Sequence, residues 1–182
     1  MGGSIEDATG RSDHPVYERS LAVGRLAAAA EIAAGLAFPF TLTARAENYL
    51  YGRPDLKDTI KRLQAYQDAG ADVLYAPGLT RLEDIATVVR SVDRPVNVVA
   101  GLTGAEWSVA DLATVGVKRV SVGSALSRAA LGAFLRGARE ILESGRFTFA
   151  EQAIGYADIN AMFSPWTRAA IPHSSLERER DL

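Results

Sequence analysis

Two kinds of apolar segment alternate along the chain, short continuous runs and longer stretches with helical spacing. Between residues 16 and 34 the apolar positions recur at three- and four-residue steps, which predicts a helix that ends at Gly35. The run 95–101 is apolar apart from Asn97, as in strands that are covered on both faces. By the same signals we expect strands at 4–6, 41–47, 71–78, 95–101 and 119–123 and helices at 16–34, 54–69, 80–91, 108–115 and 124–143. This alternation predicts five βα units and a parallel sheet.

Polar residues in front of two helices predict how these helices begin. Ser12 or Asp13 is placed to cap the helix at 16–34, with Pro15 in its first turn. Thr80 and Glu83 have the spacing of a capping box at the start of the helix at 80–91.

The strand at 41–47 presents an unusual pair of faces, because successive strand side chains point to opposite sides. One face holds Thr41, Thr43, Arg45 and Glu47, and the other holds Leu42, Ala44 and Ala46. This pattern favours a strand whose far end projects an arginine and a carboxylate into a site. The alternative is a buried Arg45–Glu47 pair that only holds the end of the sheet together.

Composition narrows the class of protein. The 182 residues are 48% apolar and 23% charged, which is typical of a globular domain with a sizeable core. A net charge of −2 without a dense basic cluster gives no reason to expect nucleic acid as a partner. No cysteine is present, so thiolate metal sites and cysteine nucleophiles are excluded. No signal segment and no run long enough to span a bilayer is visible, so we expect no membrane partner and a cytoplasmic location.

Several short motifs together resemble the isocitrate lyase/phosphoenolpyruvate mutase superfamily. The motifs are GSIED at 3–7, TARAE at 43–47, GRPDL at 52–56, AGADVLYAPG at 69–78 and VSVGS at 120–124. The resemblance implies an α/β fold, a (β/α)8 TIM-type barrel that lacks its first three βα units and carries a C-terminal helical extension. Residues 1–163 would form this partial barrel with its helical segment, and residues 164–182 a flexible tail. A true loss, a start codon placed inside the gene or a cloned fragment would each leave the chain in this form.

The resemblance also implies a catalytic pair and a cofactor. Glu6 would order water around Mg²⁺, with Mn²⁺ as an alternative ion, and Arg45 would grip substrate oxygens. The aspartates that hold the ion most directly would lie on the absent strands. From the sequence alone, Glu6 and Asp7 look like a solvated N-terminal tail.

Further substrate contacts are expected at the carboxyl ends of the strands, where such barrels place their sites. We predict substrate-binding roles for Ser4, Arg45, Glu47, Asn97 and Ser121. A hydrogen-bonded core amide is an equal alternative for Asn97, and helix capping is the simpler alternative for Ser121 and its neighbours Gly123 and Ser124. A gating loop is predicted at Gly10, Ser12, Asp13 and His14. A solvated His14 is the alternative there.

Two departures from the motifs of the superfamily indicate which of its branches the chain resembles. The lyase-branch loop motif Lys-Arg-Cys-Gly-His is replaced by residues 10–14, and the Pro-Glu pair after the sixth strand by Ala76-Pro77-Gly78. Both favour the mutase-like or decarboxylase-like branches over isocitrate or methylisocitrate cleavage.

Three functions follow as hypotheses. The first is a Mg²⁺-dependent lyase or mutase that acts on small α-keto or phosphonate acids through an enolate-like intermediate. The second is a catalytically inactive partial barrel that persists only as an assembly, because open sheet edges need cover. The third is a phosphate-binding barrel fragment that uses the Gly123-Ser124 turn. The resemblance further implies a homo-oligomer, a dimer or tetramer in which the aromatic segment 147–163 is exchanged between neighbours.

Overall fold

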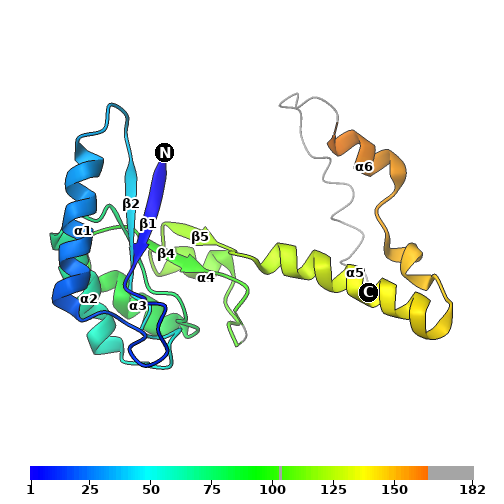
Figure 1. Ribbon diagram of the computed structural model, residues 1–182, viewed down its shortest axis with the longest axis horizontal. Helices are drawn as coiled ribbons and strands as arrows, with labels where there is room; N and C mark the ends of the chain where they lie inside the picture. Colours follow the sequence, from blue (N-terminus) through cyan, green and yellow to red (C-terminus); the bar gives the residue numbers. More distant parts are fainter. Residues whose placement is uncertain (103, 164–182) are drawn as a thin grey trace. The chain divides into compact units, whose positions relative to one another are not determined.

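The computed structural model describes residues 1–102 and 104–163, so the tail predicted at 164–182 lies outside the described residues. The chain divides into two compact units, the first covering Met1–Ser127 and the second beginning at Arg128. The first unit contains a five-stranded parallel sheet in the order β1-β2-β3-β4-β5 (Figure 1). The predicted alternation of strands and helices in a parallel sheet is therefore confirmed.

The elements follow one another as the apolar pattern predicts, although β1 is longer than predicted and the other four strands are shorter. The strands are β1 Gly2–Glu6, β2 Thr41–Arg45, β3 Val73–Tyr75, β4 Val96–Val99 and β5 Arg119–Ser121. The helices are α1 Arg19–Ala34, α2 Leu56–Asp68, α3 Leu82–Arg90, α4 Val109–Thr114, α5 Ala125–Ser144 and α6 Tyr156–Met162, with a 3₁₀ turn, η1, at Thr148–Gln152. Among the described residues, no helix combines the length and apolar character that crossing a bilayer requires.

The core of the first unit lies between the sheet and its helices. In Figure 1, α1 runs along β2, and α1 and α2 both contact β2 and each other. Leu26, Leu63 and Leu112 are at most 1% exposed and pack against the apolar face of the strands, where Leu42 and Leu74 are buried. The predicted division of β2 into two faces is confirmed on this side.

Two helix starts differ from the prediction. Neither Ser12 nor Asp13 caps α1, because Val16 forms an antiparallel bridge with Ala8 and the helix begins only at Arg19. The capping box at α3 is also wrong: Arg81 is the N-cap residue, and no side chain caps the helix. Its guanidinium pairs instead with Glu83, the residue that the box would have used.

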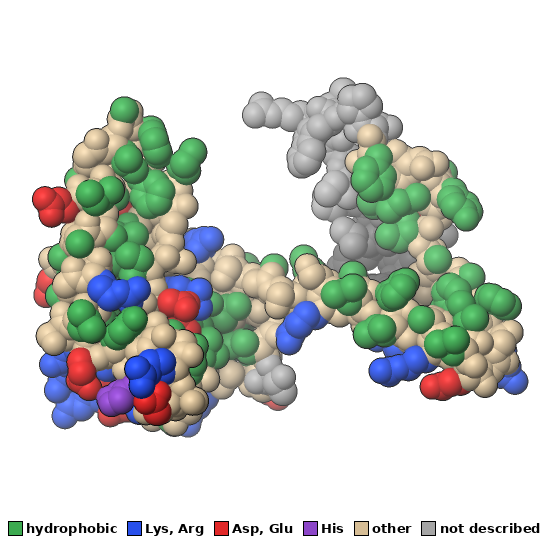
Figure 2. All heavy atoms as spheres, viewed as in Figure 1, with side chains coloured by type: hydrophobic (Ala, Val, Ile, Leu, Met, Phe, Trp, Pro, Cys, Tyr) green, Lys and Arg blue, Asp and Glu red, His purple; other side chains and the backbone are tan. Residues whose placement is uncertain are grey.

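The second unit contains most of α5 together with η1 and α6. Its turn is held by the Glu140 carboxylate, which accepts hydrogen bonds from the Thr148 N–H at 2.7 Å and the Phe149 N–H at 3.2 Å. The Phe149 ring lies against Gly137, where an added Cβ would come within 3.1 Å of it. Most apolar side chains of this unit are nevertheless exposed, as the green surface over residues 128–163 in Figure 2 shows.

Candidate functional site

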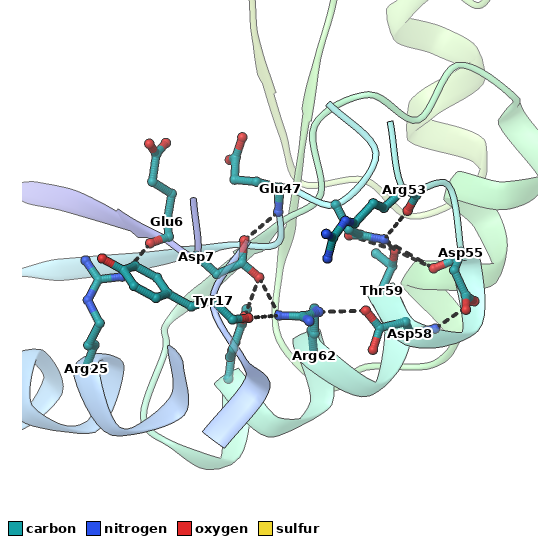
Figure 3. Close-up of polar contacts among 12 residues, drawn as sticks. Glu6, Asp7, Tyr17, Arg25, Glu47, Arg53, Asp55, Asp58, Thr59 and Arg62 are labelled. Carbon is teal, nitrogen blue, oxygen red and sulfur yellow. Dashed lines mark hydrogen bonds and ion pairs between the residues drawn. The ribbon is translucent and has the colours of Figure 1, made fainter. Parts of the chain in front are cut away.

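A guanidinium lies between two carboxylates where β1 and β2 end. Glu6 and Arg45 are register partners and the last residues of their strands, so both point to the same side of the sheet. Arg45 Nε donates to Glu47 Oε1 at 2.6 Å, and Arg45 Nη2 lies 3.3 Å from Glu6 Oε2. Figure 3 shows the carboxylates of Glu6 and Glu47 pointing to one side, away from Arg62. We call Glu6, Arg45 and Glu47 the rim triad.

Burial differs sharply within the rim triad. The Glu47 side chain is 2% exposed, whereas those of Arg45 and Glu6 are 26% and 46% exposed. Burial raises the pKa of Glu47, although the bond to Arg45 opposes the shift. Burial alone would lower the pKa of Arg45, but Glu47 and Glu6 hold it above its usual value. The triad thus joins a permanent cation, reachable from solvent, to a sheltered carboxylate.

The raised pKa of Glu47 predicts the direction in which the stability of the fold changes with pH. A carboxyl group with a raised folded-state pKa stabilises the fold fully below its unfolded pKa, near 4.5, and loses that contribution as the pH rises through the folded value. The free energy of unfolding of the wild type, relative to Glu47→Gln, is therefore expected to fall as the pH rises above 4.5. Denaturant titrations at several pH values measure it. The exposed Glu31 on α1, changed in the same way, is the control, and a Glu47 difference that does not change with pH would contradict the expectation.

An aromatic ring that the sequence analysis did not single out borders Arg45. Tyr75 is the register partner of Arg45 on β3, and the Arg45 guanidinium carbon lies 5.1 Å from the centre of its ring. Burial raises the pKa of Tyr75, which keeps the phenol neutral. The sequence contained a signal for this contact, because Tyr75 stands near the carboxyl end of the strand predicted at 71–78, next in order after the strand of Arg45.

Asn97 and Ser121 come together, as a shared site requires. The Asn97 side chain, on β4, is 1% exposed, and its Nδ2 donates to Ser121 Oγ at 3.1 Å. Its Oδ1 is the one buried side-chain oxygen or nitrogen that has no hydrogen-bond partner among the described residues. A substrate contact and a core amide thus both remain predictions for Asn97.

The remaining predicted residues make no polar contact with the rim triad in the described part of the chain. Ser4 is exposed on β1, two residues before Glu6 on the same face. The predicted gating loop follows β1: Gly10, Ser12, Asp13 and His14 are all exposed, and Asp13 pairs with Arg11. Gly123 and Ser124 directly precede α5. Their roles in gating or substrate binding stay predictions.

Asp7 and Asn48 are buried polar residues whose environment the sequence analysis did not predict. Asp7 is 2% exposed, so the solvated tail predicted for it is wrong. Asn48 is equally buried; its Nδ2 donates to Thr59 Oγ1 at 2.7 Å and to the Arg53 carbonyl at 3.1 Å. It fixes the loop that leaves the triad, and an Asn just after Glu47 gave no signal of this.

The described residues contain only part of the oxygen ligands that a magnesium site needs. No three His, Cys, Asp or Glu side chains in 1–102 and 104–163 gather closely enough to hold a metal ion. Glu6 and Glu47 both face Arg45. Mg²⁺ requires near-octahedral oxygen ligands, so these residues do not form a complete ligand set. The contact through water predicted for Glu6 stays a prediction.

The fold and the site together define a class. Five consecutive parallel βα units with a polar rim at the carboxyl ends of the strands form a section of a TIM-type barrel, with Arg45 on that rim. Residues 1–142 match the sequence profile of the family described as phosphoenolpyruvate phosphomutase. The chain belongs to this family, within the phosphoenolpyruvate mutase/isocitrate lyase superfamily.

Individual relatives agree with this placement. A Burkholderia cenocepacia structure, provisionally assigned as a lyase/mutase, is 62% identical with a TM-score of 0.87, over 90% of this chain and 59% of that one. The phosphoenolpyruvate phosphomutase of Streptomyces platensis subsp. rosaceus is 26% identical with a TM-score of 0.70, over 88% and 60% of the two chains. An uncharacterised Mycobacterium tuberculosis protein is 34% identical over 123 residues, 66% of this chain and 45% of that protein. The chain thus spans about half the length of this curated relative.

Proposed function

We propose that the chain belongs to a lyase or mutase that acts on small α-keto or phosphonate acids through an enolate-like intermediate. The observation that carries the proposal is the placement of Arg45 between Glu6 and Glu47 at the ends of adjacent parallel strands. Membership of the phosphoenolpyruvate phosphomutase family supports it. The two departures from the lyase pattern, at residues 10–14 and 76–78, favour the mutase-like or decarboxylase-like branches.

The chemistry explains why a clamped arginine matters. Breaking a C–C or P–C bond beside a keto group leaves negative charge on an enolate oxygen, which donors placed in advance stabilise. Glu47 engages Nε of Arg45 and Glu6 faces Nη2. The Arg45 side chain is 26% exposed, so N–H groups of the guanidinium that these two contacts do not use can donate to a substrate carboxylate, phosphonate or enolate oxygen. The two carboxylates fix the direction in which Arg45 donates.

A divalent ion is part of the proposal, Mg²⁺ or alternatively Mn²⁺. When bound, it would neutralise charge on the substrate oxygens. Glu6, the more exposed carboxylate, would contact it through water, and further oxygen ligands would have to come from outside the described residues.

The full chain assayed on a panel of acids tests the proposal. Oxaloacetate, phosphonopyruvate and alkylmalates are incubated with the protein and Mg²⁺ or Mn²⁺, and the products are followed by proton and phosphorus NMR. Protein-free samples correct for spontaneous decay of oxaloacetate, and EDTA samples show the dependence on metal. Turnover of at least one acid is expected; turnover of none would contradict the proposal. A sugar phosphate in the panel tests the phosphate-binding alternative.

The second candidate is an inactive partial barrel that persists as an assembly. The observation that favours it is the apolar surface of the second unit, where Phe134, Leu142, Tyr156 and Phe163 are each at least 70% exposed. Patches of this kind mark interaction sites. Micromolar binding of Mg²⁺ in calorimetry would contradict the inactive candidate.

For either candidate we propose a homo-oligomer, a dimer or tetramer in which the segment after α5 is exchanged. Deleting residues 145–182 is expected to dissociate the oligomer and so lower the number of chains per particle, because the deletion removes exposed apolar side chains such as Phe147, Tyr156 and Phe163 that a neighbour would cover. Light scattering after size-exclusion chromatography measures the mass. Deletion of 164–182 alone is the control. Dividing this mass by that of one chain gives the number of chains per particle, and an unchanged number after the longer deletion would refute the exchange.

A further inference from the structure

A buried carboxylate directly follows the rim triad in the chain. Asp7 is 1% exposed at its side chain, and protein donors surround both of its oxygens (Figure 3). Oδ1 accepts from the Glu47 backbone N–H at 2.8 Å. Oδ2 accepts from the Tyr66 hydroxyl at 2.6 Å and from Arg62 Nη1 at 3.1 Å. A buried carboxylate with this many donors is held in one orientation.

The donors connect the strand ends to α2. Arg62 and Tyr66 lie one turn apart on that helix, and Arg62 Nε also donates to Asp58 Oδ2 at 2.7 Å. Asp7 in turn holds both chain positions that flank Ala46. Its backbone N–H donates to the Arg45 carbonyl at 3.2 Å, and its side chain receives the Glu47 N–H.

Glu47 depends on this contact because it lies beyond the strand. β2 ends at Arg45, and the Ala46 N–H still bonds to the neighbouring strand, at the Tyr75 carbonyl. The Glu47 N–H instead donates to Asp7. The N–H of Glu47 is thus held by a side chain instead of the sheet ladder, while its carbonyl accepts from the Tyr51 N–H in the following turn at 3.2 Å.

We propose that Asp7 is the positioning residue of the rim triad: it fixes Glu47, and through Glu47 it fixes the direction of the Arg45 guanidinium. The inference rests on the proposed function and adds to it a residue that does not touch the substrate. A misplacement of about 1 Å at a reacting group can lower a rate about a hundred-fold, so a contact of this kind affects catalysis as well as stability.

A purely stabilising ion pair between Asp7 and Arg62 is the competing explanation, and a matched variant separates the two. Asp72 Oδ2 accepts from the Leu42 backbone N–H at 2.8 Å, the same kind of bond to the same strand, near its start and not at the end that carries Arg45. Asp7→Asn and Asp72→Asn are both expected to lower the stability of the full chain. Only Asp7→Asn is expected to weaken binding of oxalate, a planar dianion that resembles an enolate, by about ten-fold or more.

The experiment combines calorimetry of oxalate with Mg²⁺ present and hydrogen exchange of the Glu47 amide. Exchange at Glu47 is expected to be faster in Asp7→Asn and unchanged in Asp72→Asn. Stability loss without a change in oxalate affinity or in Glu47 exchange would overturn the inference. If the wild type binds no oxalate and turns over no acid, the proposed function fails, while Glu47 exchange still decides the contact with Asp7. If Asp7→Asn does not fold, Tyr66→Phe takes its place, and Glu47 exchange equal to that of Asp72→Asn overturns the inference.

Discussion

Replacing Arg45 with glutamine is expected to lower turnover of the accepted acid about 10²–10³-fold, the loss typical for one preorganised oxyanion donor. The guanidinium is the one group of the rim triad that can donate to substrate oxygens, because its neighbours Glu6 and Glu47 are acceptors when ionised. Steady-state kinetics on the acid that the wild type turns over fastest measure the loss.

Two control variants, Arg81→Gln and Arg45→Lys, separate the loss of the Arg45 hydrogen-bond donors from the general effects of removing a guanidinium or a positive charge. Arg81→Gln removes a guanidinium that is 69% exposed and pairs with Glu83, so activity is expected to stay within two-fold, in line with the small effects of exposed ion pairs. Arg45→Lys keeps the positive charge but not the planar fork, and an intermediate rate is expected. Because Arg45→Gln also leaves the buried Glu47 without its partner, the unfolding free energy is measured in parallel. Activity of Arg45→Gln equal to that of Arg81→Gln would remove Arg45 from the mechanism.

The neighbouring position of Glu6 and Arg45 was predictable because it depends on the sheet. Once the two strands are recognised and known to be parallel and adjacent, their last residues must meet at one edge. The alternation of apolar runs with glycine-terminated helices supplies both facts. The alternative of a buried Arg45–Glu47 pair agrees with the structure in part, because Glu47 is buried and bound to Arg45, whereas the Arg45 side chain is partly exposed.

The support of the triad was not predictable, because it depends on contacts between residues far apart in sequence. Asp7 receives donors from Glu47, Arg62 and Tyr66, between 40 and 59 positions away. Nothing near Asp7 in the chain distinguishes it from a solvated acid at a terminus. The failed caps at Ser12, Asp13 and Thr80 have the related cause that local signals lose to tertiary contacts, here the bridge of Val16 to Ala8 and the pairing of Arg81 with Glu83.

The packing of α2 beneath the site leads to the largest stability change that we expect. Leu63→Ala should lower the free energy of unfolding by about 2–5 kcal/mol, because Leu63 is 0% exposed and its truncation leaves a cavity in a close-packed core. Denaturant titration measures it. In a Trp166→Phe background, Trp107, whose indole N–H donates to the Thr80 carbonyl at 2.9 Å, reports on the first unit. Leu21→Ala, at a position on α1 that is 54% exposed, is the matched control, with an expected loss below about 1 kcal/mol.

The same variant separates the support of the site from its chemistry. Leu63 packs in the core and has no place in the triad, whereas Arg62 and Tyr66 on the same helix reach Asp7. Leu63→Ala should therefore reduce the fraction of folded protein while the folded molecules keep their affinity for oxalate. Equal stability losses in Leu63→Ala and Leu21→Ala would contradict the burial of α2. A selective loss of oxalate affinity in folded Leu63→Ala would show that the position of α2, beyond the bonds to Asp7, sets the geometry of Arg45.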